Sequence, residues 1–345
     1  HRMIDRIAGL PEGSYVKNPE PTYLAMLRGA SCCMVDQYLW DNPLSMGNHG
    51  YDSGKERSAT TGATQIVRDG IVIDSPEAVA EHLERIVFPQ LIEAAKFTDF
   101  DGRARMLIEQ DRAVQARIGS DFLKFPYSCI GFPGLAYWAY GYENYFMAYA
   151  LYPELMERHF SLQADVWEKY NEGAARAYAG GGLLPYSRLD HDMCDSRGPL
   201  VNIKSLEEIW FPHFARAIAP LTKTNVKMIW HCDGNIMPMV PGLLAAGVKG
   251  FQGFQYEDGV DYEKICRMKT REGDDLLIIG GVSVTTTLPH GTPADVAREM
   301  KWLVDKGPRR GLFLGGSSSI APGVPWDNLK ALIDGFRHYR NQGRK

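Results

Sequence analysis

The chain has 345 residues, a net charge of −4, and 45% hydrophobic residues. This composition is typical of a folded globular protein and excludes a disordered chain or a fibrous repeat. The sequence has no basic stripe, which leaves nucleic-acid binding without electrostatic support, and no apolar run of about 18 residues, which excludes a transmembrane span.

Short apolar runs alternate with helical patterns along the chain. Continuous apolar runs of this kind are typical of buried parallel strands. The predicted strands are 32–36, 122–125, 182–186, 226–230, 248–252, 276–280 and 312–314.

The predicted helices begin at recognisable start signals. Ser75 before Pro76 is an N-cap with proline in the first turn, and Ser205 with Glu208 forms a capping-box pattern. The predicted helices are 76–95, 153–179, 206–219, 294–304 and 325–339. An Asp-Gly turn between apolar residues also predicts a β-hairpin over 65–73.

Repeated strand–helix units predict a parallel sheet, either open and doubly wound or closed into a barrel. An open dinucleotide-binding sheet should carry GxGxxG after its first strand, and this chain has no such motif. We therefore predict an α/β protein with one domain over 1–345. Its fold is a (β/α)8 barrel, the TIM barrel, with a small N-terminal β-hairpin insertion. Catalytic residues of such barrels lie at the C-terminal ends of the strands.

Polar and titratable side chains follow the predicted strands at these ends. The candidate catalytic residues are His231, Asp233, Glu257, Asp192 and Asp36. Candidate substrate-binding residues at the same ends are Tyr38, Trp40, Tyr186, Trp230, Gln255 and Ser318. Phenols and indoles of this kind would wall an aromatic substrate, while the Gly/Ser loop around Ser318 could hold an anion through its backbone N–H groups.

Each candidate also has a purely structural interpretation. His231 could be a core histidine bonded to a backbone carbonyl, and Asp233 before Gly234 could form only a loop and a helix cap. The serines at 317–319 could form a plain turn. The functional interpretation is preferred because one rigid strand ends in His and Asp together.

A metal site is a further possibility at the same strand end. His231, Cys232 and Asp233 are all possible zinc ligands, but adjacent strand residues point to opposite faces, so His231 and Cys232 cannot share a metal. His231 and Asp233 can share one if the chain stays extended. A third ligand would come from Asp192, Glu257 or Asp36. The alternative is an acid/base pair without metal.

The six cysteines form no CxxC pair and no spacing typical of a disulfide framework. We therefore expect a reducing compartment and a cytoplasmic protein. No apolar signal segment opens the sequence.

Several motifs together resemble the uroporphyrinogen-decarboxylase-like superfamily in order and spacing, over roughly residues 20–340. The central motif is His231-Cys232-Asp233-Gly234-Asn235, followed by 243–248. The other motifs lie at 131–134, 142–144, 190–192, 198–200, 279–282, 291–293 and 320–328. The resemblance implies a TIM barrel, with Asp36 near the family's catalytic aspartate and Tyr142 near a tyrosine that lines its pocket.

The family has two main activities. One is decarboxylation of uroporphyrinogen without a cofactor, and the other is cobalamin-dependent methyl transfer, which includes demethylases acting on methoxy compounds and methylamines. The true decarboxylases carry Arg-Gln-Ala-Gly-Arg and a late histidine, where this chain has Arg6-Ile7-Ala8-Gly9-Leu10 and Ser318. The coenzyme M enzymes hold zinc with His-x-Cys and a late cysteine, where this chain has Asp233 and Ser318.

These departures favour the demethylase branch. The resemblance then implies a methyltransferase that passes a methyl group from a small methoxylated aromatic compound or a methylamine to cobalamin on a partner corrinoid protein. Zinc is optional, with His231 and Asp233 as its ligands. Two alternatives stay open. One is a cofactor-independent decarboxylase or lyase of a small carboxylate or tetrapyrrole, and the other is a barrel that binds a corrinoid or tetrapyrrole without turnover.

Overall fold

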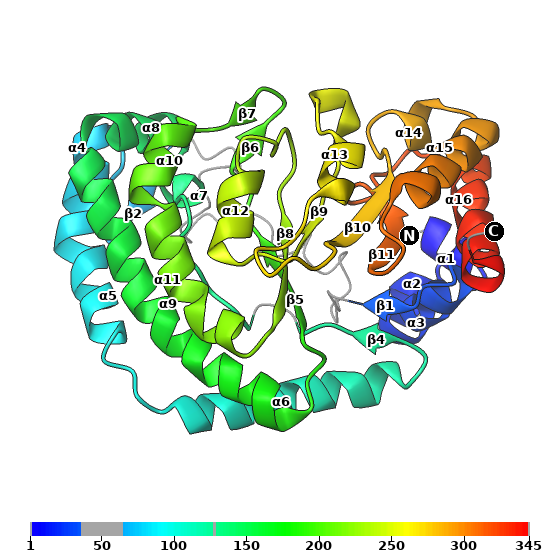
Figure 1. Ribbon diagram of the computed structural model, residues 1–345, viewed down its shortest axis with the longest axis horizontal. Coiled ribbons are helices and arrows are strands. Elements are labelled where there is room, and N and C mark those ends of the chain that lie inside the picture. The colour runs from blue at the N-terminus through cyan, green and yellow to red at the C-terminus, as the bar shows by residue number, and fades with distance from the viewer. Residues whose placement is uncertain (1, 36–64, 127–128, 344–345) are drawn as a thin grey trace.

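The computed structural model describes residues 2–35, 65–126 and 129–343. Parallel strands lie at the centre of the molecule, and helices surround them (Figure 1). A five-stranded parallel sheet has the order β11-β10-β9-β8-β5. Its strands are β5 (Tyr186–Asp190), β8 (Lys227–His231), β9 (Gly250–Gln252), β10 (Leu277–Val282) and β11 (Leu312–Gly316). A second parallel pair joins β1 (Met34–Val35) to β4 (Leu123–Lys124).

One apolar cluster connects the two sheets. Phe125, Ile229 and Ile279 are its buried members, with Met34 of β1 and Phe313 of β11 packed against them. The strands contribute alternate residues to it, as expected for the inner layer of a barrel. The arrangement is compatible with the predicted (β/α)8 barrel, although the strands of the described residues form separate hydrogen-bonded sheets.

The larger part of the core lies between the strands and the surrounding helices. Met228 and Trp230 of β8 belong to this outer core, whereas Ile229 between them faces the inner cluster. The helices are α1 (Arg2–Ala8), α2 (Ser14–Lys17), α3 (Pro19–Gly29), α4 (Pro76–His82), α5 (Phe88–Ala94), α6 (Phe100–Ile118), α7 (Tyr137–Tyr140), α8 (Tyr142–Leu151), α9 (Pro153–Gly181), α10 (Ile203–Ile209), α11 (Phe211–Lys223), α12 (Val240–Ala246), α13 (Tyr262–Arg267), α14 (Thr287–His290), α15 (Pro293–Lys306) and α16 (Trp326–Gln342).

The two ends of the chain lie side by side (Figure 1). Arg337 of α16 donates hydrogen bonds to the Gly29 carbonyl at 2.7 Å and to the Ser31 hydroxyl at 3.1 Å. This contact joins the last helix to the segment that leads into β1. No helix of the described residues is long and apolar enough to cross a membrane.

The predicted hairpin is confirmed as β2 (Val67–Arg68) and β3 (Ile71–Val72), which pair antiparallel. Asp69 and Gly70 both have positive φ, 48° and 81°, as a tight hairpin turn requires. A second hairpin, β6 (Cys194–Asp195) and β7 (Gly198–Pro199), follows β5 and had no sequence prediction.

The strand predicted at 182–186 begins only at Tyr186 and extends to Asp190. The apolar pair Leu183-Leu184 suggested the earlier position, but the strand itself alternates. Ser187 and Leu189 are buried, whereas Tyr186, Arg188 and Asp190 are more exposed. Such alternation is a weaker signal than a continuous apolar run.

Two predicted helices are divided near a proline, which lacks the N–H that helix continuation needs. The helix predicted at 206–219 begins at Ile203 and is interrupted at Trp210, just before Pro212. Its cap is Asn202, not Ser205, whose hydroxyl bonds the Tyr149 hydroxyl. The helix predicted at 76–95 contains a π-helical turn, Leu83–Val87, just before Pro89.

Candidate active site

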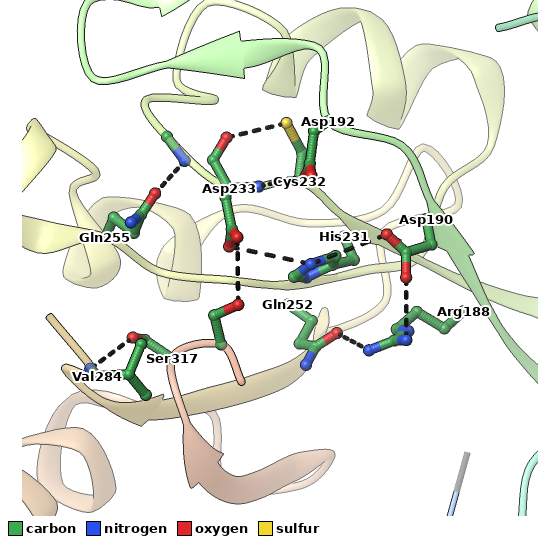
Figure 2. A network of polar contacts seen from close by, with 12 residues as sticks. Arg188, Asp190, Asp192, His231, Cys232, Asp233, Gln252, Gln255, Val284 and Ser317 are labelled. Atoms are coloured by element: carbon green, nitrogen blue, oxygen red, sulfur yellow. Dashed lines mark hydrogen bonds and ion pairs between the residues drawn. The ribbon is translucent and has the colours of Figure 1, made fainter. Parts of the chain in front are cut away.

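A layer of polar side chains lies at the C-terminal ends of β5, β8 and β9. The parallel register places Asp190 beside His231, and His231 beside Gln252. Arg188, two residues before Asp190, faces the same side of β5 (Figure 2). Below this layer lies the inner apolar cluster, in which Tyr186 of the same strand stacks on Phe125 with a centroid distance of 4.9 Å.

His231 lies in the middle of the polar layer and is only 8% exposed. Its Nε2 is 3.9 Å from Oδ1 of Asp190 and 3.9 Å from Oδ1 of Asp233. Both distances exceed hydrogen-bond length. Nδ1 on the far side of the ring is also buried and has no partner among the described residues.

Gly253 lies beside the imidazole of His231, where the absence of a side chain leaves space for the ring. Its φ is 87°, and a Cβ at this position would lie 3.1 Å from Nδ1 of His231. The backbone after β9 therefore passes close to the ring at a position where glycine is favoured both for conformation and for space.

Arg188 orients the carboxylate of Asp190. Its guanidinium donates to Oδ2 of Asp190 at 3.0 Å and to Oε1 of Gln252 at 2.9 Å. The arginine side chain is 8% exposed and the aspartate side chain 34%, so the guanidinium is largely removed from solvent while the carboxylate is partly exposed. With Oδ2 held by the guanidinium, Oδ1 of Asp190 is the oxygen that faces His231 (Figure 2).

The loop after β8 is held by three neighbouring segments. The Asp233 N–H donates to Oδ1 of Asp192 at 3.0 Å, the Ser318 hydroxyl donates to Oδ2 of Asp233 at 3.2 Å, and the Gly234 N–H donates to Oε1 of Gln255. Gly234 has φ 85°, and a Cβ there would lie 2.5 Å from the Asp195 carbonyl oxygen. Gln255 and Ser318 therefore position this loop.

Burial raises the pKa of Asp233 above its usual value. The nearby carboxylates of Asp192 and Asp190 raise it further, whereas His231 and the Ser318 hydroxyl lower it. Oδ1 of Asp233 is buried and has no hydrogen-bond partner in the described part of the chain.

Cys232 points away from this layer, as predicted. Its Sγ accepts a hydrogen bond from the Met193 N–H at 3.2 Å and donates to the Asp233 carbonyl at 3.1 Å. The thiol is fully buried, and its pKa is raised well above the usual value, first by a hydrogen bond with Cys194 and then by burial.

Three predicted residues lie away from His231. Trp230 is fully buried in the outer core against Phe132, Trp210 and Phe214, and so cannot wall a substrate on the inner side. Glu257 accepts a hydrogen bond from Ser283 after β10, at 3.0 Å.

Tyr186 belongs to the apolar layer below the site. Asp36, Tyr38 and Trp40 lie outside the described residues.

In the loop after β11, Ser318 contacts Asp233, whereas Ser317 does not face the site. Ser317 is fully buried, its N–H donates to the Val282 carbonyl, and its hydroxyl accepts from the Val284 N–H. These bonds connect the end of β11 to β10 and leave Ser317 no part in anion binding.

A pocket of about 470 Å³ adjoins the site. Asp192 belongs to both, because its carboxylate holds the loop after β8 and also lines the pocket. Tyr137 and Tyr142 stack at 4.8 Å on another wall. His191 points away from the carboxylates, accepts the Leu135 N–H at 2.8 Å, and has its pKa lowered to about 4 by burial.

Arg188, Asp190 and Gln252 lie at the ends of predicted strands but were not among the predicted site residues. The signal for the first two was available once β5 is placed at 186–190, because alternation then puts Tyr186, Arg188 and Asp190 on one face. Gln252 ends β9 beside His231, and a single polar residue in an apolar strand was the only signal.

A sequence model described as Uroporphyrinogen decarboxylase (URO-D) matches residues 135–339, which is more than half of the chain. The matched segment contains β5, β8, β9 and the loops that carry the polar layer. No curated protein matches the chain. The fold of the family is a TIM barrel, in agreement with the parallel strands described above. The chain therefore belongs to the uroporphyrinogen decarboxylase (URO-D) family.

Proposed function

We propose that this protein is a methyltransferase. It takes a methyl group from a small methoxylated aromatic compound or a methylamine, and the acceptor is a corrinoid on a partner protein. The observation that carries the proposal is the environment of His231, where three carboxylates gather above an aromatic floor. Such a site suits a neutral or cationic methyl donor better than a polyanion.

The chemistry assigns a definite task to this chain. A reduced corrinoid, when bound, supplies the nucleophile for displacement at the methyl carbon. The protein must bind the donor and stabilise the oxygen or nitrogen that leaves with the electron pair of the broken bond. At His231 this is possible either with a proton on Nε2 or with a metal ion that Nε2 helps to bind.

The charges argue against uroporphyrinogen as the substrate. Asp190, Asp192 and Asp233 surround the site, and the cation among the described residues of the polar layer is Arg188, already bonded to Asp190. Substrates with many carboxylates need several cationic partners. Arg6, in place of the decarboxylases' arginine segment, stacks over the Trp326 ring at 3.9 Å.

The floor of the site accommodates an aromatic ring. Phe125, Tyr186 and Phe313 pack together below the polar layer. Gly315 lies above Phe313 on the same face of β11, and an added Cβ there would meet nothing within 4 Å among the residues that the structure describes. This open position leaves space for a ring beside the polar groups.

Arg188 favours one second candidate, a carboxy-lyase for a small carboxylate. Its guanidinium lies in the polar layer, and a single carboxylate could replace Gln252 as one of its partners while Asp190 keeps the other. Such an enzyme needs no corrinoid partner.

The two candidates differ in their products. The test incubates the purified protein with reduced cobalamin and a panel of methoxyaromatic compounds and methylamines, followed by visible spectroscopy. A parallel series with small aromatic carboxylates is followed by carbon dioxide release. We expect consumption of reduced cobalamin with one donor class and no carbon dioxide. Carbon dioxide release without methyl transfer would replace the proposal by the lyase.

A further inference from the structure

We propose that Asp190, Asp192 and His231 bind one divalent transition-metal ion. One ligand atom from each of the three residues lies within 4.8 Å of the other two. Two of them come from β5 and the turn that follows it, and the third ends the neighbouring strand β8 (Figure 2). The proposal does not require methyl transfer, since metal binding can be measured without donor or acceptor.

The imidazole of His231 provides an independent observation. It is 8% exposed, and neither ring nitrogen forms a hydrogen bond within the part of the chain described here. Buried polar groups in native proteins nearly always have a partner, because an unpaired group loses its hydrogen bonds to water without replacement. Nε2 is nevertheless directed toward carboxylates that are too distant for a hydrogen bond.

The distances fit an ion between the side chains. Nε2 of His231 is 3.9 Å from Oδ1 of Asp190. Metal–nitrogen and metal–oxygen bonds of about 2.0–2.2 Å can join two ligand atoms separated by this distance. The same gap is too long for a direct hydrogen bond.

The local charge also calls for a cation. The carboxylates of Asp190, Asp192 and Asp233 face one imidazole, and the positive group among the described residues beside them is the guanidinium of Arg188. Three carboxylates and one guanidinium leave two negative charges when all are ionised. A divalent ion neutralises them.

The carboxylates are already oriented in the manner of metal ligands. Arg188 holds Oδ2 of Asp190, and the Asp233 N–H holds Oδ1 of Asp192, which leaves one oxygen of each carboxylate for the ion. Metal ligands are commonly positioned by such outer hydrogen bonds. The sequence prediction paired His231 with Asp233. The structure places Asp190 and Asp192 in the compact ligand set and Asp233 beside it.

The ligand types limit which ion is expected. One imidazole and two carboxylates suit zinc, manganese, iron(II) or cobalt(II), and the set contains no thiolate. Cys232 cannot supply one, because its Sγ is bonded to the Met193 N–H in the core. Binding is therefore expected to be reversible by chelators.

The test uses the full chain after chelator treatment, titrated separately with Zn²⁺ and Mn²⁺ in a calorimeter. Co²⁺ absorption reports the ligand geometry. Asp192→Asn is the main variant because Asp192 is exposed and its loss should not prevent folding. His231→Gln and Asp190→Asn are the companions. Asp305→Asn, on the exposed face of α15, is the matched control. Circular dichroism verifies that each variant is folded.

We expect one ion per chain, a dissociation constant weakened at least about tenfold in each of the three variants, and no change in the control. The absence of stoichiometric binding of any of the three ions would overturn the proposal. Undiminished binding in folded Asp192→Asn and His231→Gln would also overturn it. Either result leaves the methyl-transfer assay free to succeed or fail separately.

Discussion

His231 and Asp190 end neighbouring parallel strands with Nε2 of the histidine 3.9 Å from Oδ1 of the aspartate, close but not hydrogen bonded. The β5–β8 register fixes this relationship, and Arg188 fixes the carboxylate. The interpretation of the site rests on what occupies that gap: a leaving group, a proton or a metal ion.

Replacing His231 tests its part in leaving-group activation. His231→Ala should slow methyl transfer by about 10²–10⁴-fold with little change in donor binding, as expected for a lost acid or metal ligand. Donors with good leaving groups should be affected least, since they need little activation. The measurement is the single-turnover rate across donors of graded leaving-group ability. Equal losses for all donors would indicate a structural histidine.

Cys232→Ala is the control for His231→Ala, because Cys232 is the next residue along the chain but points to the opposite face. Because Sγ is buried on the opposite face, this variant should transfer methyl groups at nearly the wild-type rate once folded. A loss as large as that of His231→Ala would mean that the thiol takes part in the reaction.

Two arginine–aspartate pairs, each two residues apart in the sequence, differ in how exposed the arginine is and so test what its burial contributes to stability. Arg188 pairs with Asp190 and is 8% exposed, whereas Arg197 pairs with Asp195 and is 88% exposed. Arg188→Met should lower the free energy of unfolding by about 1–3 kcal/mol, because Asp190 loses its partner. Arg197→Met should change it by less than about 1 kcal/mol. Urea denaturation measures both, and equal effects would contradict the burial argument.

Replacing Gly253 tests whether the site needs the space beside the imidazole of His231. Gly253→Ala places a Cβ 3.1 Å from Nδ1 of His231 at a φ of 87°. Gly273 has a φ of 90°, and an added Cβ there meets nothing within 4 Å among the described residues, so Gly273→Ala reproduces the backbone strain alone. Both should lose about 1–2 kcal/mol of stability, but only Gly253→Ala should also weaken metal binding and methyl transfer. Equal metal binding and equal methyl-transfer rates in the two variants would show that the space at Gly253 does not matter to the site.

His159 of α9 links stability to pH. Burial lowers its pKa to about 4, against an ordinary value near 6.5 in the unfolded chain. The unfolded chain therefore binds the proton more readily, so this contribution to stability is full above about pH 6.5 and is lost as the pH falls toward 4. His159→Leu should reduce the fall in unfolding free energy between pH 7 and about 5. His191, with its pKa also lowered to about 4, should retain part of it. The measurement is urea denaturation at a series of pH values. If the free energy of unfolding fell as steeply with pH in His159→Leu as in the wild type, His159 would not be a source of this pH dependence.

The sequence identified the strand that carries His231 because its apolar run is continuous and buried. It misplaced β5, whose alternation of buried and more exposed residues includes Arg188 and Asp190, and so it missed half of the polar layer. The alternation that correctly placed Cys232 away from the site also places Trp230 away, which the prediction overlooked. Long-range pairings such as Asp233 with Ser318 depend on the register of distant strands, and no local pattern encodes them.

The fate of the methyl group itself is the most direct test of the central claim. A donor with a ¹³C-labelled methoxy or N-methyl group is incubated with the protein and reduced cobalamin, and the products are followed by ¹³C NMR. The account predicts that the label moves intact to the corrinoid, in equal amount with the demethylated product, and that His231→Ala slows this transfer. Label that remains on every donor tested, together with carbon dioxide release from a small carboxylate, would contradict it.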